Sequence, residues 1–403
     1  MSSGVAESNR PALDTAVRRI MAGAVADGEI DLSIGEPDQA LPDILVETAV
    51  RSLRTGRTGY TPKLGLPELR ELVADDVATS TGHRPATDDV VITVGGTGAV
   101  AVALAAASSP ATGIVVPDPA WPNYRILATR LGIPVHSYPQ GGSGAGFADL
   151  ARIEDGLRAG ARLVVVNSPA NPTGAVASGD ALRSLVDLVR RHDAYLLSDE
   201  AYESIVYAGG RAPSPLSHGP DVTFCARTFS KTYSMTGLRV GALISPPRFR
   251  GDVAALHGTV AGCAPITAQV TAMEALRSLS GRGSELAAIY RERHRSAVDV
   301  LGPWAPSATT DELGGFYLWL DVRSTGHTSD EVCDALRARG VVVSSGRVYS
   351  GMDVFVRLAL TAPDARLGQA LRTIRAELDR LAAGPPPLDD PLYSQPKIAG
   401  TAP

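Results

Sequence analysis

Cysteine is scarce in this 403-residue sequence, and long hydrophobic runs are absent. Cys225, Cys263 and Cys333 lie far apart without a CxxC pair, which argues against a disulfide framework or a cysteine-based zinc site and predicts reduced thiols in a cytoplasmic protein. No stretch approaches the roughly 18 apolar residues of a membrane-spanning helix. The N-terminus also lacks the charged and apolar regions of a secretory signal. We therefore expect no membrane partner.

Strong charge is missing as well, since the formal net charge at pH 7 is only −5. No basic field argues for binding to nucleic acid or to an anionic membrane. With 44% hydrophobic and 20% charged residues, the chain has the composition of an ordinary globular protein. Its length suits one large domain and a smaller companion.

From residue 90 onward, apolar strands alternate with helical segments, which predicts an α/β domain with a mostly parallel sheet. Strands are expected at 90–94, 113–116, 134–138, 163–166, 195–197, around Phe224 and at 239–244, with helices at 99–107, 121–131 and 179–191. A smaller α+β unit is expected over 302–384, with strands at 315–322, 341–344 and 353–360 and helices at 328–339 and 364–383. Residues 1–10 are expected to form a tail and 11–27 a helix, and the extension at 385–403 has no periodicity.

The segment from Arg227 to Gly241 places Lys231 among small hydroxyl residues, with Arg239 eight positions downstream. This pattern suits a cofactor with an aldehyde at one end and a phosphate at the other, such as pyridoxal phosphate (PLP). A lysine can hold the aldehyde as a Schiff base, while Arg239 with the hydroxyls of Thr228 and Ser230 can hold the phosphate. The alternative interpretation of the segment alone is a polar turn.

Other candidate side chains follow predicted strands, where ligands of α/β sheets collect. Gly95-Gly96-Thr97 joins a strand to a helix, so its backbone N–H groups face any anion placed there, although such a turn is often a mere connection. Asp199 ends an apolar strand and could pair with a protonated ring nitrogen; its alternatives are a helix cap or an ion-pair partner.

Three further residues near strand ends could contact a flat aromatic cofactor. Tyr202 and Asn171 could hydrogen-bond a phenolate oxygen, and Trp121 could stack on the ring. The alternatives are a turn-forming Asn-Pro for Asn171 and a core position for Trp121.

Arg357 lies inside the apolar run Val354–Leu360, where a guanidinium is costly unless it meets an anion such as a carboxylate. A strand-edge arginine that faces solvent is the alternative. Gly35 follows a short strand and could allow a ligand to approach the backbone, or could simply form a turn.

Together these segments resemble the fold type I PLP enzymes of the aspartate aminotransferase superfamily, specifically its class I/II aminotransferases, over roughly residues 30–380. The most specific match runs from Ser230-Lys231 to Gly237-Leu-Arg239-Val-Gly241 and is similar to the family's S-K-x(5)-G-x-R-x-G signature. The companions are Asn171-Pro-Thr-Gly174, Asp199-Glu-Ala-Tyr202, Val94-Gly-Gly-Thr-Gly-Ala99 and Asp118-Pro-Ala-Trp-Pro-Asn-Tyr124.

The resemblance implies a role for each matching residue. Lys231 would form the internal aldimine and move the proton between Cα and C4′ by way of a quinonoid. The other expected contacts are Gly96, Thr97, Thr228 and Arg239 with the phosphate, Trp121 with the ring face, Asn171 and Tyr202 with the phenolate oxygen, Asp199 with the ring nitrogen, Tyr60 with the phosphate of a partner subunit, and Arg357 with the substrate α-carboxylate near Gly35 and Asn171.

The implied architecture is a large domain with a seven-stranded, mostly parallel sheet between helices and a smaller α+β domain built from both chain ends. The expected divisions are 1–45 (arm and part of the small domain), 46–285 (large domain), 286–384 (small domain) and 385–403 (extension). The implied protein is a homodimeric aminotransferase that moves the amino group of an L-amino acid to a 2-oxo acid and uses no metal. Elimination, replacement, cyclisation or oxidation on the same scaffold is the alternative, and a binding protein without catalysis is a third.

Two departures from the family bear on the substrate. The stretch 258–265 has no arginine where dicarboxylate-specific members carry one, and Thr97 replaces a lysine that some bacterial relatives use. Both disfavour aspartate and glutamate as dedicated substrates. Leu41, Cys263 and Ile34 suggest a pocket without fixed positive charge.

Overall fold

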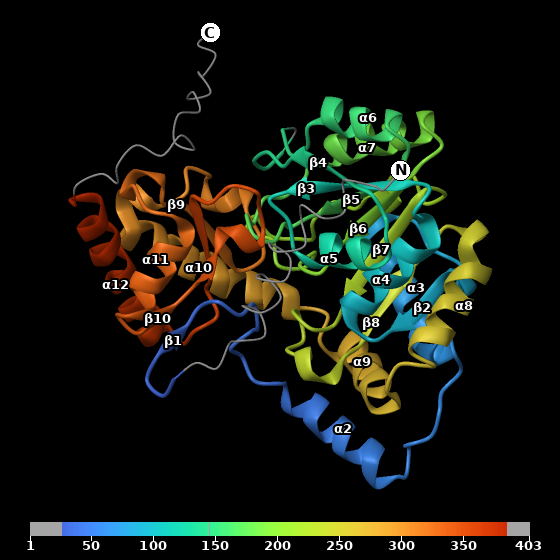
Figure 1. Ribbon diagram of the computed structural model, residues 1–403. Helices are drawn as coiled ribbons and strands as arrows, with labels where there is room; N and C mark the ends of the chain where they lie inside the picture. The colour runs from blue at the N-terminus through green and yellow to red at the C-terminus, as the bar shows by residue number, and fades with distance from the viewer. Residues whose placement is uncertain (1–25, 145, 385–403) are drawn as a thin grey trace.

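The computed structural model describes residues 26–144 and 146–384, drawn in colour in Figure 1. The predicted tail at 1–10, nearly all of the predicted helix at 11–27 and the extension at 385–403 lie outside the described residues.

A seven-stranded sheet forms the centre of the larger part of the molecule, in the order β2-β8-β7-β6-β5-β3-β4. The strands are β2 (Val90–Thr93), β3 (Gly113–Asp118), β4 (Val135–Pro139), β5 (Ala161–Asn167), β6 (Tyr195–Asp199), β7 (Thr223–Thr228) and β8 (Gly241–Ile244). All neighbours are parallel except the two pairs that involve β8. The expected α/β architecture with a mostly parallel sheet is therefore confirmed.

Helices cover both faces of this sheet because the apolar strands bury side chains on both sides. In β5, Leu163 and Val165 pack on one face and Val164 and Val166 on the other. One face is covered by α4 (Gly95–Ala107), α5 (Asn123–Arg130) and α8 (Arg250–Val260). The other is covered by α3 (Pro67–Thr81), α6 (Leu150–Arg158), α7 (Gly179–Arg191) and α9 (Ile266–Ser278).

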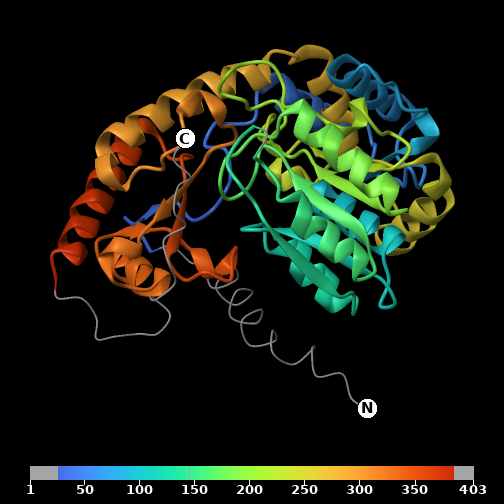
Figure 2. The same cartoon turned by 90° about the horizontal axis from the view of Figure 1, so that it is seen from above.

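A smaller antiparallel sheet, β11-β12-β9, lies beside the large one. It comprises β9 (Tyr317–Asp321), β11 (Ser344–Ser345) and β12 (Phe355–Ala359), packed with α10 (Arg282–Leu301), α11 (Ser329–Arg337) and α12 (Asp364–Ala382). Figure 2 shows α10 as the long helix that runs from the large sheet to the smaller one. The domain limits at residues 45, 285 and 384 stay a prediction.

The first strand of the described chain pairs in parallel with a strand of the smaller unit. β1 (Ile30–Asp31) lies beside β10 (Val341–Val342), so the segment that follows β1 enters the space between the two sheets. The single strand expected at 341–344 is instead divided, since β10 pairs with β1 whereas β11 pairs with β12.

Two other expectations differ from the structure. Helix α4 begins at Gly95 rather than at Ala99, because the positive φ of Gly95 (+69°) turns the chain directly into the helix. Helix α6 was not expected; Asp149 caps it by accepting the N–H of Arg152 at 3.1 Å, and Ile153 and Leu157 are buried.

The parallel strands bring four chemically useful ends to one edge of the sheet. β3, β5, β6 and β7 end at Asp118, Asn167, Asp199 and Thr228, and Asn167 is the register partner of Asp199. Because carboxyl ends of parallel strands share an edge, the side chains at these ends can converge on one ligand.

Candidate functional site

A cavity of about 700 Å³ lies between this edge of the large sheet and the smaller sheet. Its wall includes every site residue expected from the sequence except Tyr60. Those residues are Gly35, Gly96, Thr97, Trp121, Asn171, Asp199, Tyr202, Thr228, Ser230, Lys231, Arg239 and Arg357. Residues from positions 33 to 357 of the chain thus share one wall.

Lys231 projects its amine to the carbonyl oxygen of Gly35, with an Nζ to O distance of 2.6 Å. Burial, together with the cationic Arg357 and Arg239, lowers the pKa of this amine to about 8, and Glu36 and Asp199 oppose the lowering. A substantial fraction of the amine is therefore neutral near pH 8, as a nucleophile or proton acceptor must be.

Asp199 is held at the end of β6 by its neighbours. The hydroxyl of Tyr124 donates to its Oδ2 at 2.5 Å, and the N–H of Ala201 donates to its Oδ1 at 3.2 Å. Burial raises the pKa of Asp199 to about 6, although the bond from Tyr124 opposes this rise. The side chain of Asn167 donates to the Asp199 carbonyl at 2.9 Å and accepts the N–H of Asn171 at 2.7 Å, which joins the ends of β5 and β6.

The first turn of α4 faces the segment that contains Arg239 and Thr228. A Cβ on Gly95 would lie 2.8 Å from an Arg239 Nη2, and one on Gly96 would lie 3.3 Å from the Cβ of Thr228. Both glycines therefore permit a close approach. Arg239 itself has a left-handed backbone (φ 56°), which costs a non-glycine residue on the order of 1 kcal/mol and is most often tolerated at functional sites.

Thr228 and Ser230 form a pair of hydroxyls beside this turn. The Thr228 hydroxyl donates to Ser230 Oγ at 2.9 Å and accepts the backbone N–H of Ser230 at 3.2 Å. N–H groups of the α4 terminus, two hydroxyls and a guanidinium together make a donor set typical of phosphate sites.

Arg357 lies in β12 with only 5% of its surface exposed. Its Nη1 donates to Asn171 Oδ1 at 3.1 Å and its Nη2 donates to the carbonyl of Ser33, whereas its Nε is buried without a hydrogen-bond partner. Its guanidinium lies over the rings of Tyr317 and Tyr349, 4.3 and 4.7 Å from their centroids. A buried guanidinium with an unsatisfied donor on a cavity wall is suited to an anionic ligand.

Two pairs of aromatic side chains lie at the cavity. The Trp121 ring meets that of Tyr124 edge to face, with 5.3 Å between centroids. The hydroxyls of Tyr202 and Tyr317 are 2.9 Å apart.

Tyr60 does not reach the cavity of its own chain. Its side chain is 97% exposed. The expectation that it contacts the site of a second subunit stays a prediction.

Several site residues were missed by the sequence reasoning: Ser33, Tyr124, Asn167, Tyr317 and Tyr349. Tyr124 lies three residues from Trp121 and Asn167 four residues from Asn171, within or beside the same motifs, so spacing could have suggested both. No comparable motif surrounds Tyr317 or Tyr349, so the sequence does not distinguish them from other aromatic residues of the smaller unit.

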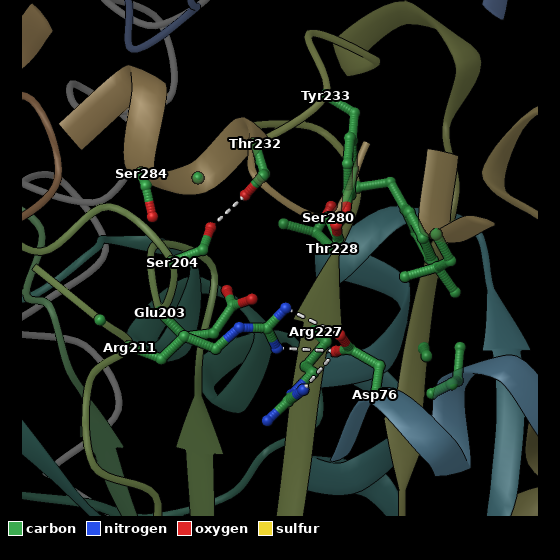
Figure 3. A pocket seen from close by; sticks show the side chains of 16 residues that line it. Asp76, Glu203, Ser204, Arg211, Arg227, Thr228, Thr232, Tyr233, Ser280 and Ser284 are labelled. Atoms are coloured by element: carbon green, nitrogen blue, oxygen red, sulfur yellow. Dashed lines mark hydrogen bonds and ion pairs between the residues drawn. The ribbon is translucent and has the colours of Figure 1, made fainter. Parts of the chain in front are cut away.

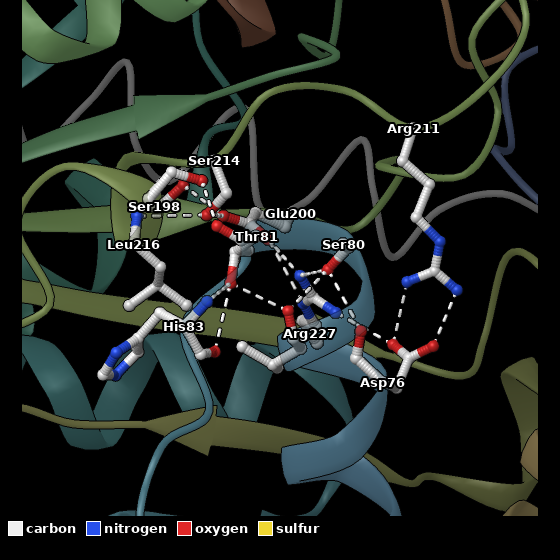
Figure 4. Close-up of polar contacts among 12 residues, drawn as sticks. Asp76, Ser80, Thr81, His83, Ser198, Glu200, Arg211, Ser214, Leu216 and Arg227 are labelled. Carbon is white, nitrogen blue, oxygen red and sulfur yellow. Dashed lines mark hydrogen bonds and ion pairs between the residues drawn. The ribbon is translucent and has the colours of Figure 1, made fainter.

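A polar cluster that includes Arg227 of β7 and Asp76 of α3 lies beside the segment that contains Lys231. We call Asp76, Glu200, Glu203, Arg211 and Arg227 the Arg227 cluster. It borders a second cavity of about 60 Å³, shown in Figure 3. Arg227 bonds Glu200 Oε2 at 3.0 Å and Asp76 Oδ2 at 2.9 Å (Figure 4), and Arg211 bonds Asp76 at 2.7 Å.

Arg227 directly precedes Thr228, and Glu200 directly follows Asp199. The bond between Arg227 and Glu200 therefore joins the ends of β6 and β7, where Asp199 and Thr228 lie. Glu203 lies next to Arg211 in Figure 3. Burial raises the pKa of Glu203 to about 7, with Arg227 and Arg211 opposing the rise and Asp76 and Glu200 adding to it.

Comparison with known proteins points to one family. The family model for aminotransferase class I and II matches residues 27–374. The chain is 32% identical to an aspartate aminotransferase of Thermotoga maritima over 86% of this chain and 90% of the relative. It is 31% identical to a valine–pyruvate aminotransferase of Mycobacterium tuberculosis, again over 86% and 90%.

Solved structures show the same likeness. The aspartate aminotransferase of Thermus thermophilus with maleate superposes with a TM-score of 0.81 at 26% identity, covering 94% of this chain and 97% of that one. Within residues 26–144 and 146–384, no helix is long and apolar enough to cross a membrane.

Proposed function

Since the chain belongs to the class I and II aminotransferase family, we propose that Lys231, Asp199 and Arg357 carry out its PLP-dependent transfer of an amino group from an L-amino acid to a 2-oxo acid. The observation that supports these roles is their convergence: an amine of lowered pKa, a buried carboxylate and a buried guanidinium share one cavity. Because the relatives named above are aminotransferases, amino-group transfer is favoured over elimination, replacement, cyclisation or oxidation.

The residues present fit PLP from its phosphate to its ring. Gly96, Thr97, Thr228, Ser230 and Arg239 supply donors for the phosphate, and the close approaches at Gly95 and Gly96 form the cradle. When bound, PLP supplies an aldehyde that bonds to amines and a protonated ring that withdraws electrons from the substrate Cα.

At the ring end, Asp199 would face the ring nitrogen and keep it protonated. Tyr124 would hold the carboxylate in place, Trp121 would cover one ring face, and Asn171 and Tyr202 would contact the ring oxygen. These are the groups nearest the carboxyl edge of the large sheet.

At the substrate end, Arg357 would bind the α-carboxylate, with Asn171 and the Gly35 segment beside it. The unsatisfied Nε of Arg357 offers a further donor toward the anion. Lys231, whose amine lies against Gly35, would then take the proton from the substrate Cα and return it to the cofactor carbon.

Among the described residues, the cations on the cavity wall are Lys231, Arg239, Arg337 and Arg357. Three of them have roles above, and Arg337 is ion-paired with Glu29 at 3.2 Å. We therefore propose that substrates with apolar or aromatic side chains are preferred over aspartate and glutamate.

The test is a panel of L-amino acids added singly to the PLP-loaded protein, with the cofactor spectrum recorded and products identified by mass. Transamination predicts stoichiometric formation of the 2-oxo acid and loss of the aldehyde absorbance. A different product from the amino acid would support the alternative reactions. An unchanged spectrum with every amino acid would instead support a binding protein. Faster conversion of aspartate than of apolar amino acids would contradict the substrate preference.

We also propose a homodimer in which Tyr60 reaches the partner's cavity. Tyr60 is 97% exposed, and α2 (Asp43–Arg54) presents Val46, Val50 and Leu53 on its exposed side. Subunits carrying Tyr60→Ala should regain activity when mixed with subunits carrying Lys231→Ala, because one site of the mixed dimer is then intact. A monomer in sedimentation, with no recovery on mixing, would contradict this arrangement.

A cytoplasmic location is proposed from the thiols. Cys225 and Cys263 are free thiols, and Cys225 is buried. Fractionation of cells that produce the protein would test this.

A further inference from the structure

Tyr317 contacts three functional groups of the cavity although it is only 3% exposed. It begins β9 in the smaller sheet, directly opposite Ala359 and two register positions from Arg357. Its ring contacts the Arg357 guanidinium, its hydroxyl contacts Tyr202, and the same hydroxyl packs on Gly35.

The Tyr317 hydroxyl and the Lys231 amine both contact Gly35. A Cβ at position 35 would lie 1.7 Å from the Tyr317 hydroxyl oxygen, so only glycine leaves room for it. The carbonyl of Gly35 accepts from Lys231 at 2.6 Å. The Tyr317 hydroxyl thus occupies the room that glycine leaves at position 35, and the approach of a ligand to Gly35 stays a prediction.

The hydroxyl pair of Tyr202 and Tyr317 has a definite proton order once the ring oxygen of PLP is the acceptor. A phenol has one proton to donate. If Tyr202 donates its proton to the ring oxygen, the 2.9 Å contact requires that Tyr317 donates to Tyr202. Burial raises the pKa of both phenols, so both keep their protons at neutral pH.

The ring of Tyr317 contacts Arg357, the residue proposed to bind the substrate carboxylate. Its face lies 4.3 Å from the Arg357 guanidinium carbon, and the Tyr349 ring lies 4.7 Å from the same atom. Two aromatic faces confine the guanidinium to one plane, which directs its donors toward Asn171 and the cavity.

We propose that Tyr317 is a positioning residue that acts on both ends of the reacting centre: its hydroxyl orients and polarises Tyr202 toward the cofactor ring oxygen, and its ring orients Arg357 toward the substrate carboxylate. The inference rests on the roles proposed above for Tyr202 and Arg357. It assigns two separable functions to one side chain.

The first test is Tyr317→Phe, which removes the hydroxyl and keeps the ring. Hydrogen bonds to the cofactor ring oxygen stabilise its ionised form. Without the Tyr317 hydroxyl, the bond from Tyr202 is weaker, so the cofactor should keep its proton to a higher pH. The pH midpoint of the bound cofactor's absorbance change should rise by about 0.5 to 1 unit, and kcat should fall about 3- to 10-fold. KM for the amino acid should change less than about 2-fold, because the ring still supports Arg357.

Tyr349→Phe is the matched control for the midpoint. It also removes a hydroxyl from a ring beside Arg357, but that hydroxyl contacts Ser344 Oγ at 3.3 Å rather than Tyr202. Its midpoint should equal that of the parent protein. A Tyr317→Phe variant with the parental midpoint would overturn the hydroxyl's role.

A double-variant cycle separates this role from general structural damage. In a Tyr202→Phe background, Tyr317→Phe should produce no further shift, because the residue through which it acts is gone. An equal shift in both backgrounds would show that Tyr317 does not act through Tyr202.

The ring's role is tested by Tyr317→Leu, which should raise KM for the amino acid about 3- to 30-fold through loss of the cation–π contact. If this variant fails to fold, the midpoint and the cycle with Tyr317→Phe still decide the hydroxyl's role. Arg357→Lys distinguishes the two levels of inference. An unchanged KM in Arg357→Lys would refute the proposed carboxylate site itself. A large rise of KM in Arg357→Lys, together with a parental KM in a folded Tyr317→Leu, would refute only the positioning of Arg357 by the ring.

Discussion

Replacing Tyr124 by phenylalanine removes one hydroxyl from a fully buried side chain and leaves its ring in place. That hydroxyl donates to Oδ2 of Asp199 at 2.5 Å, and the ring stays edge to face with Trp121. The change therefore acts on the hydrogen bonding of Asp199 and hardly on packing.

The size of the effect follows from the pKa of Asp199. Burial holds this pKa at about 6 despite the lowering by Tyr124, so removing the donor must raise it. A hydrogen bond to a charged group contributes about 1.5 to 3 kcal/mol, which corresponds to about 1 to 2 pKa units. The ionised fraction of Asp199 at pH 7 should then fall from about 90% to between about 50% and 10%.

The assay is the affinity of the apoprotein for PLP, measured across about pH 5.5 to 8.5. If Asp199 pairs with a protonated ring nitrogen, affinity is lost as pH falls through the Asp199 pKa. The midpoint of that loss should lie about 1 to 2 units higher in Tyr124→Phe, so the two proteins differ most near neutral pH.

Stability provides a second readout with a definite sign. The folded pKa of Asp199 is above its ordinary value of 3.8, so ionisation of Asp199 already opposes folding at high pH. The variant enlarges this penalty. The free energy of unfolding of the apoprotein should therefore fall more at pH 8 than at pH 5.

Tyr138→Phe is the control, because Tyr138, which lies in β4, is also a fully buried tyrosine but donates to the carbonyl of Val165 at 3.0 Å. It should lose some stability and keep the affinity midpoint of the parent. A Tyr124→Phe variant whose midpoint matches that of Tyr138→Phe would refute the reasoning about Asp199.

Three further predictions concern the same site and its support. Lys231→Ala should leave a folded protein that has no covalent cofactor absorbance and no turnover; a parental spectrum would refute the assignment of Lys231. Gly35→Ala should displace the Tyr317 hydroxyl, because its Cβ would lie 1.7 Å from that oxygen, and should lower the free energy of unfolding by about 1 to 3 kcal/mol together with kcat; parental kcat would contradict this. Glu203→Gln should raise the melting temperature above pH 7. The pKa of Glu203 is about 7 in the folded protein against an ordinary 4.5, so the ionised carboxylate opposes folding by up to about 3 kcal/mol. That gain should disappear below the ordinary carboxyl pKa, and an equal gain at every pH would point to a different cause.

Much of the fold follows from local sequence. Strands such as β5 are apolar on both faces, and helices such as α7 carry buried residues at helical spacing, so element types and the parallel sheet could be predicted. Helix α6 was missed because it is only nine residues long and follows a glycine-rich stretch. The sequence predicts a start of α4 at Ala99 rather than at Gly95, because glycine at positions 95 and 96 favours turns as readily as a first helical turn.

The candidate site divides in the same way. Local order accounts for Lys231 with Arg239, for Asp199 with Tyr202 and for Asn171, since each set lies within a few residues of a strand end. The family, the cofactor and twelve of the residues on the cavity wall can therefore be predicted from local sequence.

Which of these groups are in contact depends on how distant segments pack. Tyr124 meets Asp199 across 75 positions, Tyr317 meets Tyr202 across 115, and Lys231 reaches Gly35 across 196. The lowered pKa of Lys231 comes from burial and from the distant Arg357 and Arg239, and the raised pKa of Asp199 comes mainly from burial. Hydrogen bonds and desolvation act over a few ångströms of space, and no local pattern records which distant segments packing will bring within that range.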